Sequence, residues 1–391
     1  MKKRVYADNA ATTRLSRPAL DAMMPYLTSE YGNPSALHTM GREAKLALER
    51  ARNQTASVLG AVPEEIYFTS GGTEADNWAV KAAAELGKNK GRHIISTQIE
   101  HHAILNPLLC LEAQGFEVTY LGVDAQGRIS LKALRDAIRK DTILISVMAA
   151  NNEIGTIQPI AKIGKLAKEH KILFHVDAVQ AIGHIPLDIQ SAGIDMLSLA
   201  AHKFGGPKGA GALYVRKGIS LPSQIQGGGQ ERNLRSGTEN VAGIVGMAAA
   251  LEYRNARMGS HMEKVLLLRN RLIEGLLRIP NARLTGDLLN RLPGIASFLF
   301  EGVEGESMVM MLDLHGICAS SGSACASNGH ESSHVLKAIG IPRQLSHSSL
   351  RLSLNEDNTD EDVDHILEVL PSVVARLRAM SPVWNGSREN Y

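Results

Sequence analysis

The chain has 391 residues, of which 44% are hydrophobic and 21% are charged, with a formal net charge of +2. This composition is typical of a soluble globular protein, and the length predicts a large domain with a smaller one beside it. The nearly balanced charge contains no basic tract, and no apolar run is long enough to span a bilayer, which argues against nucleic-acid binding and membrane association. The basic start at residues 2–4 is not followed by the apolar stretch of a secretory signal, so we expect a cytoplasmic protein.

Short apolar runs alternate with amphipathic helical patterns over roughly the first 240 residues. Several runs are apolar throughout, which is typical of strands that are covered on both faces. Between them, stripes such as Ile160, Ile163 and Ala167 predict helices. This order predicts an α/β fold with a mostly parallel seven-stranded sheet and helices on both faces. The predicted strands are Ile66–Thr69, His93–Thr97, Glu117–Leu121, Ile143–Met148, Ile172–Val176, Met196–Leu199 and Ala212–Val215.

The pattern changes after about residue 240, where we predict a smaller α/β domain. We expect the large domain to span residues 13–255 and the small one to combine residues 1–12 with 256–391. The elements predicted there are a helical stretch over Val241–Ile279 that breaks at Gly259 and Ser260, a strand over Gly294–Phe300, a helix near Glu306–His315, a strand over Ser348–Leu354 and a last helix from Thr359.

The residues that follow each predicted strand are candidates for a site, because reactive groups collect at the carboxyl ends of parallel strands. After the first strand, Gly71 and Gly72 allow a tight turn and Thr73 opens a helix, whose free N–H groups suit a phosphate. The alternative is an ordinary turn with Thr73 as the N-cap. After the next strand come His101 and His102, which are either ordinary histidines or rings that stack on a flat ligand and move protons.

Amides and a carboxylate follow two later strands. Asn151 and Asn152 either hold a ligand or build a turn with their own backbone. Asp177 directly follows one of the most apolar runs of the chain, where an unpaired carboxylate is costly. It either caps a helix or pairs with a protonated ring nitrogen of a bound cofactor, with Gln180 three residues further on.

Lys203 stands between the apolar run Met196–Ala201 and a glycine-rich exit. Burial lowers the pKa of a lysine toward the neutral amine, which can condense with an aldehyde. A lysine on an exposed loop is the alternative, but it explains neither the apolar run nor the glycines. Together the strand ends require a ligand with a phosphate, an aldehyde, a flat ring and a protonatable ring nitrogen. Pyridoxal 5'-phosphate (PLP) has all four.

The three cysteines are too few for a disulfide framework, which favours a reducing compartment. Cys325 lies among small residues in "ASSGSACASNG", as expected of a partly exposed, reactive thiol. We expect Cys318 to be a small core residue and Cys110 to lie on the buried face of a helix. The sequence has no C-x-x-C pair, the spacing that would indicate a metal site. Arg351, in the strand "SSLRLSL", either holds a substrate carboxylate or pairs with a surface acid.

Nearly the whole chain resembles the NifS/IscS-type cysteine desulfurases, a class V branch of the PLP-dependent fold type I enzymes. The resemblance implies this fold type, a homodimer, and transfer of sulfur from L-cysteine to an iron–sulfur scaffold or another acceptor protein. It implies no intrinsic metal, although Cys325 would share a transient iron–sulfur cluster with a scaffold. The segments that carry it are "YADNAATT", "YGNPSALH", "TSGGTEADN", "EHHAIL", "NNEIGTIQPI", "HVDAVQAIG", "AAHKFGGPKGAGALYV", "GGGQERNLRSGTEN", "SSGSACASNG" and "HSSLRLSL".

The resemblance also implies a role for each matching residue. Lys203 would hold PLP covalently and Cys325 would attack the sulfur of the bound substrate, become a persulfide and allow L-alanine to leave. His101 would stack on the ring and handle protons. Ala200 stands where the family commonly has a serine, so one phosphate contact is missing. The remaining roles are the pyridinium partner Asp177, the ring-oxygen partner Gln180, the phosphate ligands Gly72, Thr73, His202 and, from the partner subunit, Thr238, and the carboxylate ligands Asn152 and Arg351.

Three other functions remain open at this point. A selenocysteine lyase or another class V aminotransferase-like enzyme would use the same cofactor site, although a plain aminotransferase has no use for Cys325. A non-catalytic sulfur carrier would use the cysteine alone and would not need Lys203. A nicotinamide-dependent dehydrogenase is disfavoured, because no G-x-G-x-x-G opens a helix near the N-terminus.

Overall fold

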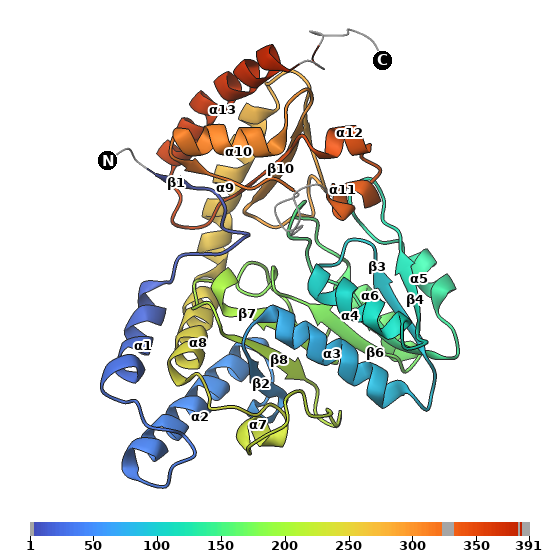
Figure 1. The fold of residues 1–391 in the computed structure, drawn as a ribbon, viewed down its shortest axis with the longest axis vertical. Helices are drawn as coiled ribbons and strands as arrows, with labels where there is room; N and C mark the ends of the chain where they lie inside the picture. The colour runs from blue at the N-terminus through green and yellow to red at the C-terminus, as the bar shows by residue number, and fades with distance from the viewer. Residues whose placement is uncertain (1–3, 323–331, 382–383, 385–391) are drawn as a thin grey trace.

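The computed structural model describes residues 4–322, 332–381 and 384 (Figure 1). Its main sheet has seven strands in the order β2-β8-β7-β6-β5-β3-β4, which confirms the predicted α/β fold. β8 is antiparallel to both of its neighbours, and all other pairs are parallel. The strands are β2 (Ile66–Thr69), β3 (His93–Thr97), β4 (Glu117–Leu121), β5 (Thr142–Ser146), β6 (Leu173–Asp177), β7 (Met196–Ala200) and β8 (Gly211–Val215).

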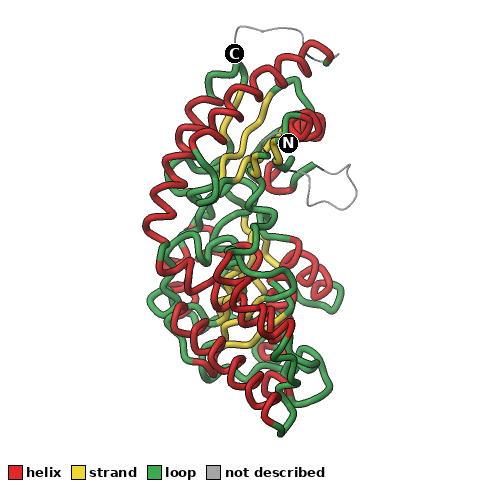
Figure 2. The backbone as a smooth tube through the Cα atoms, turned by 90° about the vertical axis from the view of Figure 1, so that its left-hand side faces the viewer, coloured by secondary structure: helices red, strands yellow, loops and turns green. Residues whose placement is uncertain are grey.

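Helices cover both faces of this sheet, as its apolar strands predict. Ile94 packs with α3 (Gly72–Gly87) and α4 (His102–Glu112), whereas the next residue, Ile95, packs with the helices of the other face. Side chains alternate between the faces of a strand, so each face has its own core. In Figure 2 the strands lie inside and the helices outside. The second face is covered by α2 (Thr39–Leu59), α6 (Ile160–Glu169) and α8 (Val241–Ala256).

A second core is built from both ends of the chain, in the upper part of Figure 1. Val5, near the N-terminus, shares it with Phe298, Leu350 and Val363. Strand β10 pairs antiparallel with β9 and β12, and β1 pairs in parallel with β11. The elements are β1 (Val5–Tyr6), α9 (Met258–Leu276), β9 (Ala282–Leu284), β10 (Ile295–Phe300), α10 (Gly305–Leu314), β11 (Ile317–Cys318), β12 (Ser349–Ser353) and α13 (Asp360–Met380).

The remaining elements are short or lie at the edges of the molecule. None of the helices in the described part of the chain is both long and apolar enough to cross a membrane. These elements are α1 (Arg17–Thr28), α5 (Leu131–Ala137), α7 (Gln230–Asn233), α11 (His334–Ala338), α12 (Arg343–Ser346) and the 3₁₀ turns η1 (Pro63–Glu65) and η2 (Ala201–Lys203).

Two local predictions are wrong. The long helical stretch breaks at Arg257, between α8 and α9, and Gly259 and Ser260 lie inside α9. Cys110 is exposed rather than buried, because α4 packs through Ile104, Leu108 and Leu111 and presents the other side to solvent. The prediction that Cys318 is a core residue is confirmed only in part, because Cys318 is half-buried at the end of β11.

Candidate active site

A cavity of about 320 Å³ opens at the carboxyl ends of the parallel strands. It unites residues that are up to 341 positions apart in the chain, from Ala10 to Arg351. Thr238 is exposed and is not part of its wall, and Cys325 lies outside the described residues. The predicted site residues that line the cavity are Gly72, Thr73, His101, Asn152, Asp177, Gln180, His202, Lys203 and Arg351.

Lys203 is held at the cavity by the turn that follows β7. The strand is buried along its whole length and leads into the 3₁₀ turn η2, of which Lys203 is the last residue. Its Nζ donates to the carbonyl oxygens of Ala10 at 2.7 Å and Ala11 at 3.0 Å. The ring of His184, which does not line the cavity, forms a hydrogen bond with the Lys203 carbonyl oxygen at 2.8 Å. The amine therefore lies inside the cavity and not on a solvated loop.

Three buried carboxyl groups, those of Asp76, Glu100 and Asp177, interact with one another, and the charge of Asp177 also interacts with that of Lys203. Asp177 ends β6, and burial raises its pKa to about 6. Burial, and then the charge of Asp177, raise the pKa of Asp76 well above its usual value, and burial raises that of Glu100 to about 8. One oxygen of Asp76, Oδ1, has no hydrogen-bond partner among the described residues. Such a cluster favours a ligand that brings a positive charge or a proton to the cavity floor.

His101 presents a neutral imidazole to the cavity. It is the N-cap of α4, and its Nδ1 accepts from the backbone N–H of Ala103 at 3.1 Å. Because Nδ1 accepts, the ring proton is on Nε2 in the neutral form. Burial, and next the charge of Lys203, lower the pKa of His101 to about 4. The residue can therefore stack on a flat ring or exchange a proton through Nε2.

The opposite end of the cavity suits an anion. Helix α3 begins at Gly72 with Gly71 as its N-cap, so Thr73 is the second helical residue and the N-cap interpretation of Thr73 is wrong. A Cβ on Gly72 would lie 2.6 Å from Val179 Cγ2, and the site needs glycine for this close approach. The free N–H groups of a helix start favour a phosphate. His202, whose Nδ1 bonds Thr12 Oγ1 at 3.1 Å, lines the same cavity.

Arg351 enters the cavity from β12, the strand on the other core. Its Nη1 donates to the carbonyl oxygen of Asn152 at 2.8 Å, and its Nη2 donates to Asp8 Oδ1 at 2.9 Å. Asn151 has the turn-building role, because its Oδ1 accepts from the N–H groups of Glu153 and Ile154, both at 2.9 Å. The turn leaves Asn152 on the cavity wall, where its carbonyl oxygen accepts from Arg351.

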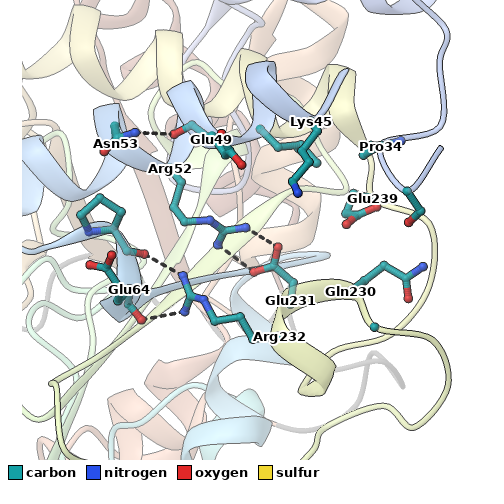
Figure 3. A pocket seen from close by; sticks show the side chains of 14 residues that line it. Pro34, Lys45, Glu49, Arg52, Asn53, Glu64, Gln230, Glu231, Arg232 and Glu239 are labelled. Carbon is teal, nitrogen blue, oxygen red and sulfur yellow. Dashed lines mark hydrogen bonds and ion pairs between the residues drawn. The ribbon is translucent and has the colours of Figure 1, made fainter. Parts of the chain in front are cut away.

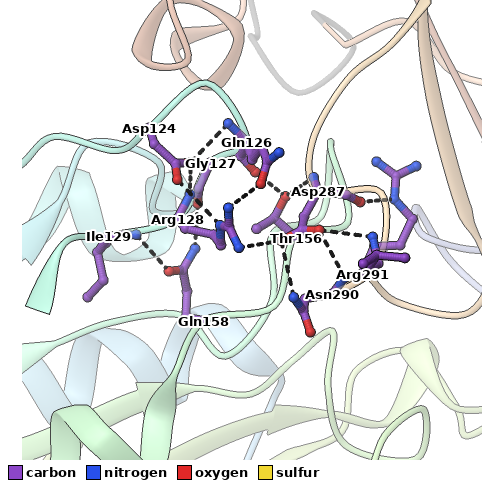
Figure 4. A network of polar contacts seen from close by, with 11 residues as sticks. Asp124, Gln126, Gly127, Arg128, Ile129, Thr156, Gln158, Asp287, Asn290 and Arg291 are labelled. Carbon is purple, nitrogen blue, oxygen red and sulfur yellow. Dashed lines mark hydrogen bonds and ion pairs between the residues drawn. The ribbon is translucent and has the colours of Figure 1, made fainter.

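A polar network outside the cavity fixes this turn against the other core (Figure 4). Thr156 Oγ1 donates to the carbonyl oxygen of Gln126 at 2.6 Å and accepts from the N–H of Asp287 at 3.0 Å. Arg128 pairs with the Asp287 carboxylate at 3.3 Å. Because the bridge between Ala150 and Ile157 closes the turn, these bonds also restrain the residues between them, including Asn152.

Sequence reasoning missed the segment of residues 8–13, here called the strap, which runs along the cavity. The carbonyl oxygen of Ala10 accepts from both Lys203 and Gln180, the latter at 2.9 Å. Thr13 Oγ1 donates to the carbonyl oxygen of His202 at 2.9 Å. Most of these contacts use backbone oxygens, which every residue has. The strap was therefore indicated only by the segment "YADNAATT", which is one of those that carry the family resemblance.

The residues present fit PLP. The orphaned oxygen of Asp76 and the buried Asp177 form an acidic floor, a neutral imidazole forms a wall, and the helix start at Gly72 forms an anion-binding end. An amine stands between them. The set of donors matches the acid, ring, phosphate and aldehyde requirements of that cofactor.

Similar proteins carry consistent names. The chain is 54% identical to the cysteine desulfurase IscS of Methanosarcina thermophila over 381 residues, which are 97% of this chain and 94% of that protein. A solved structure of a NifS-like protein has a TM-score of 0.91 at 41% identity and covers 96% of this chain and 100% of its own. The structure of SspA in complex with cysteine has a TM-score of 0.80 at 38% identity and covers 90% and 99% of the two chains. A family profile matches over most of the length, and the chain therefore belongs to the aminotransferase class-V family, which is matched by residues 5–366.

Proposed function

We propose that this chain is a PLP-dependent cysteine desulfurase, which converts L-cysteine to L-alanine and supplies the sulfur for iron–sulfur cluster assembly. The observation that carries the proposal is the convergence of Lys203, Asp177, His101 and Arg351 on one cavity. Relatives that are named cysteine desulfurases span nearly the whole chain, which supports the same activity here.

In the proposed site, Lys203 would hold PLP covalently through Nζ and Asp177 would pair with the ring nitrogen. Gly72, Thr73 and His202 hold the phosphate. When bound, PLP supplies an electron sink that makes the substrate α-proton acidic. The amine of Lys203, held by the carbonyl oxygens of the strap, is in reach of the cavity centre and is the proposed acceptor of that proton.

The substrate carboxylate is proposed to bind Arg351 and Asn152. The side chain of Arg351 is 6% exposed, and a bidentate carboxylate contact is strong where water is excluded. Cys325, which lies outside the described residues, then attacks as the thiolate. One thiol and one L-cysteine become one enzyme persulfide and one L-alanine. The C–S bond of the substrate breaks, an S–S bond forms, and the β-carbon gains a proton.

The proposed assembly is a homodimer, in which Thr238 reaches the phosphate site of the partner subunit. A row of exposed apolar side chains on and after α1 supports an interface, because such patches are rare on monomers. They are Leu20, Met24, Leu27, Tyr31 and Leu37. We also propose that residues 13–255 form the large domain and residues 1–12 with 256–391 the small one. The proposed location is the cytoplasm, where a reducing environment keeps a thiol free.

The test is a Cys325→Ala variant, with Cys110→Ser as the matched control. Cys325→Ala should lose at least about a hundredfold in alanine release from L-cysteine, because no thiolate remains to accept the sulfur. The control should keep wild-type activity, since Cys110 is exposed on the outer side of α4. Persulfide labelling should mark the wild type and Cys110→Ser but not Cys325→Ala. Wild-type alanine release from Cys325→Ala would contradict the proposal.

A further inference from the structure

The guanidinium of Arg351 is oriented by two partners before any substrate arrives. Its side chain is 6% exposed, and it pairs with Asp8 at 2.9 Å and with the carbonyl oxygen of Asn152 at 2.8 Å. Its Nε is buried and has no hydrogen-bond partner among the described residues. A guanidinium has five N–H donors, so two are used and three remain. Arg351 is therefore fixed in place while it keeps donors for a further acceptor.

Asp8 approaches Arg351 from outside the cavity. Arg351 is part of the cavity wall, whereas Asp8 is not. The backbone of Asp8 lies beside β12, where Asn9 donates to the carbonyl oxygen of Ser353 at 3.1 Å and Ser353 donates to that of Ala7 at 2.7 Å. These bonds fix the Asp8 carboxylate beside the arginine. A substrate carboxylate can then bind without displacing it.

The same strap also positions the amine. Two residues after Asp8, the carbonyl oxygen of Ala10 accepts from Lys203 and from Gln180, and that of Ala11 accepts from Lys203. Consecutive Cα atoms are about 3.8 Å apart, so the strap sets the separation between the group that holds the carboxylate and the amine. The substrate needs both contacts at once.

We propose that Asp8 is a positioning residue that orients the guanidinium of Arg351 toward the substrate carboxylate. Through the strap, it also fixes the distance between this guanidinium and the amine of Lys203. This inference rests on the proposed function, because it takes Arg351 as the carboxylate ligand. Asp8 does not touch the substrate. Its carboxylate also balances the buried positive charge when no substrate is bound.

A second acid near Arg351 provides a matched control. Glu153 is buried and accepts from Ser333 Oγ at 2.5 Å, and its charge interacts with that of Arg351. No hydrogen bond joins Glu153 to the guanidinium in the described part of the chain. Glu153→Gln therefore removes a neighbouring acid without removing a contact that aims Arg351.

The experiment compares the variants Asp8→Ala, Asp8→Asn, Asp8→Glu and Glu153→Gln in the PLP-loaded protein. Asp8→Ala should raise the KM for L-cysteine about tenfold, with kcat within about threefold, because a charge-assisted hydrogen bond contributes on that scale. Asp8→Asn should raise KM less, since its amide oxygen can still accept, and Asp8→Glu should restore part of the loss. Glu153→Gln should change KM less than Asp8→Ala. An unchanged or lowered KM in Asp8→Ala would overturn the proposal.

A binding measurement separates positioning from a general structural role. L-Alanine and ethylamine, which differ in the carboxylate, are titrated against the cofactor absorbance. Asp8→Ala should weaken L-alanine binding about tenfold and leave ethylamine binding within twofold. Equal weakening of both ligands would overturn the proposal.

A double variant tests the role of Asp8 separately from that of Arg351. In an Arg351→Lys background, Asp8→Ala should have less than a twofold effect on L-alanine binding, because the guanidinium that Asp8 aims is gone. An additive effect would overturn the role of Asp8 alone. If Arg351→Lys itself does not weaken L-alanine binding, the proposed role of Arg351 fails together with that of Asp8. If the wild type releases no alanine from L-cysteine, the desulfurase assignment fails.

Discussion

Two hollows of this molecule differ in how their charged groups are satisfied. The first, of about 510 Å³, lies between α2 and the segment around α7 (Figure 3). There Arg52 makes two hydrogen bonds to the Glu231 carboxylate, at 2.5 and 2.8 Å. Arg232 donates to the carbonyl oxygens of Pro63 and Glu64 at 2.9 and 2.6 Å. These charges stabilise the chain's own backbone.

The second hollow, the cavity at the strand ends, is smaller, at about 320 Å³. Its wall contains an amine, the buried acids Asp76 and Asp177, and a carboxylate oxygen, Asp76 Oδ1, without a hydrogen-bond partner among the described residues. Burying polar groups without partners costs free energy, so such an arrangement is explained by a ligand that completes it. The first hollow also has such an oxygen, Glu239 Oε2, so a single unmet group does not distinguish the two. What distinguishes the functional cavity is the combination of an amine, buried acids and a helix start on one wall.

The variant Lys203→Ala tests whether the second hollow is the functional one, and it has the largest expected effect. We expect a loss of roughly a thousandfold or more in alanine release, because among the described residues that line the cavity Lys203 is the one lysine. The purified variant should also lack the yellow colour of PLP bound through an amine. The midpoint of thermal unfolding should fall relative to the PLP-loaded wild type, because the variant loses the stabilisation by the bound cofactor, and less relative to the wild type without PLP.

The control for this prediction is the exposed lysine Lys132, which pairs with Asp136 on the surface of α5. Lys132→Ala should keep both colour and activity. A colourless Lys132→Ala variant, or a yellow and active Lys203→Ala variant, would contradict the assignment of the amine.

For the first hollow we predict a loss of stability, and not of activity, in the variant Arg52→Met. The side chain of Glu231 is 3% exposed, so removal of Arg52 leaves a buried carboxylate without its cation. We expect the free energy of unfolding to fall by about 3 kcal/mol. Chemical denaturation measures this change.

The double variant Arg52→Met/Glu231→Gln is the matched control for this prediction. It removes the stranded charge, and the amide oxygen of the new side chain can still accept from the N–H of Phe68, as Glu231 does at 2.9 Å. It should recover at least half of the lost stability. If Arg52→Met alone unfolds like the wild type, the ion pair does not stabilise this segment.

The smallest expected effect is a change in pH dependence caused by Glu100→Gln. Burial raises the pKa of Glu100 to about 8, well above its value of about 4 in an unfolded chain. Between these values the folded state holds a proton that the unfolded state has lost, so stability falls as pH rises. Histidines with lowered pKa values act in the opposite direction, but only below their unfolded pKa of about 6.5. They are the buried His175 and the half-buried His101, His184 and His202.

The informative window is therefore pH 6.5 to 8 in the protein without PLP. There the wild type should lose stability with rising pH, and Glu100→Gln should lose less, by about 1 kcal/mol over the window. Unfolding midpoints at a series of pH values measure the slope. A variant with the same slope as the wild type would show that Glu100 is already ionised at pH 6.5.

Much of the site could be predicted because its chemistry lies in side chains at predictable places. Lys203, Asp177 and His101 each follow an apolar run, and the parallel order of the strands brings their ends together. Asn152 and Arg351 come from different cores, and only the resemblance could pair them. The strap acts mainly through the carbonyl oxygens of Ala10 and Ala11, which carry no signal in a sequence.

The two errors of the fold also have physical causes. The sequence of α4, "HAILNPLLCLE", is apolar on most of its circumference, so hydrophobicity did not show that Leu109 and Cys110 face outward. The helix break at Arg257 depends on the packing of α8 and α9 on different cores. The intrinsic preferences of Gly259 and Ser260 therefore did not decide its place.

The contact between Asp8 and Arg351 joins residues 343 positions apart. During synthesis on the ribosome, Asp8 cannot contact Arg351 until almost all of the chain has been made. The loop-closure entropy grows only with the logarithm of chain length, so the delay costs little free energy. It does order events in time: residues 10–13 can meet Lys203 while the polypeptide is still growing, whereas the contact between Asp8 and Arg351 forms only near the end of translation.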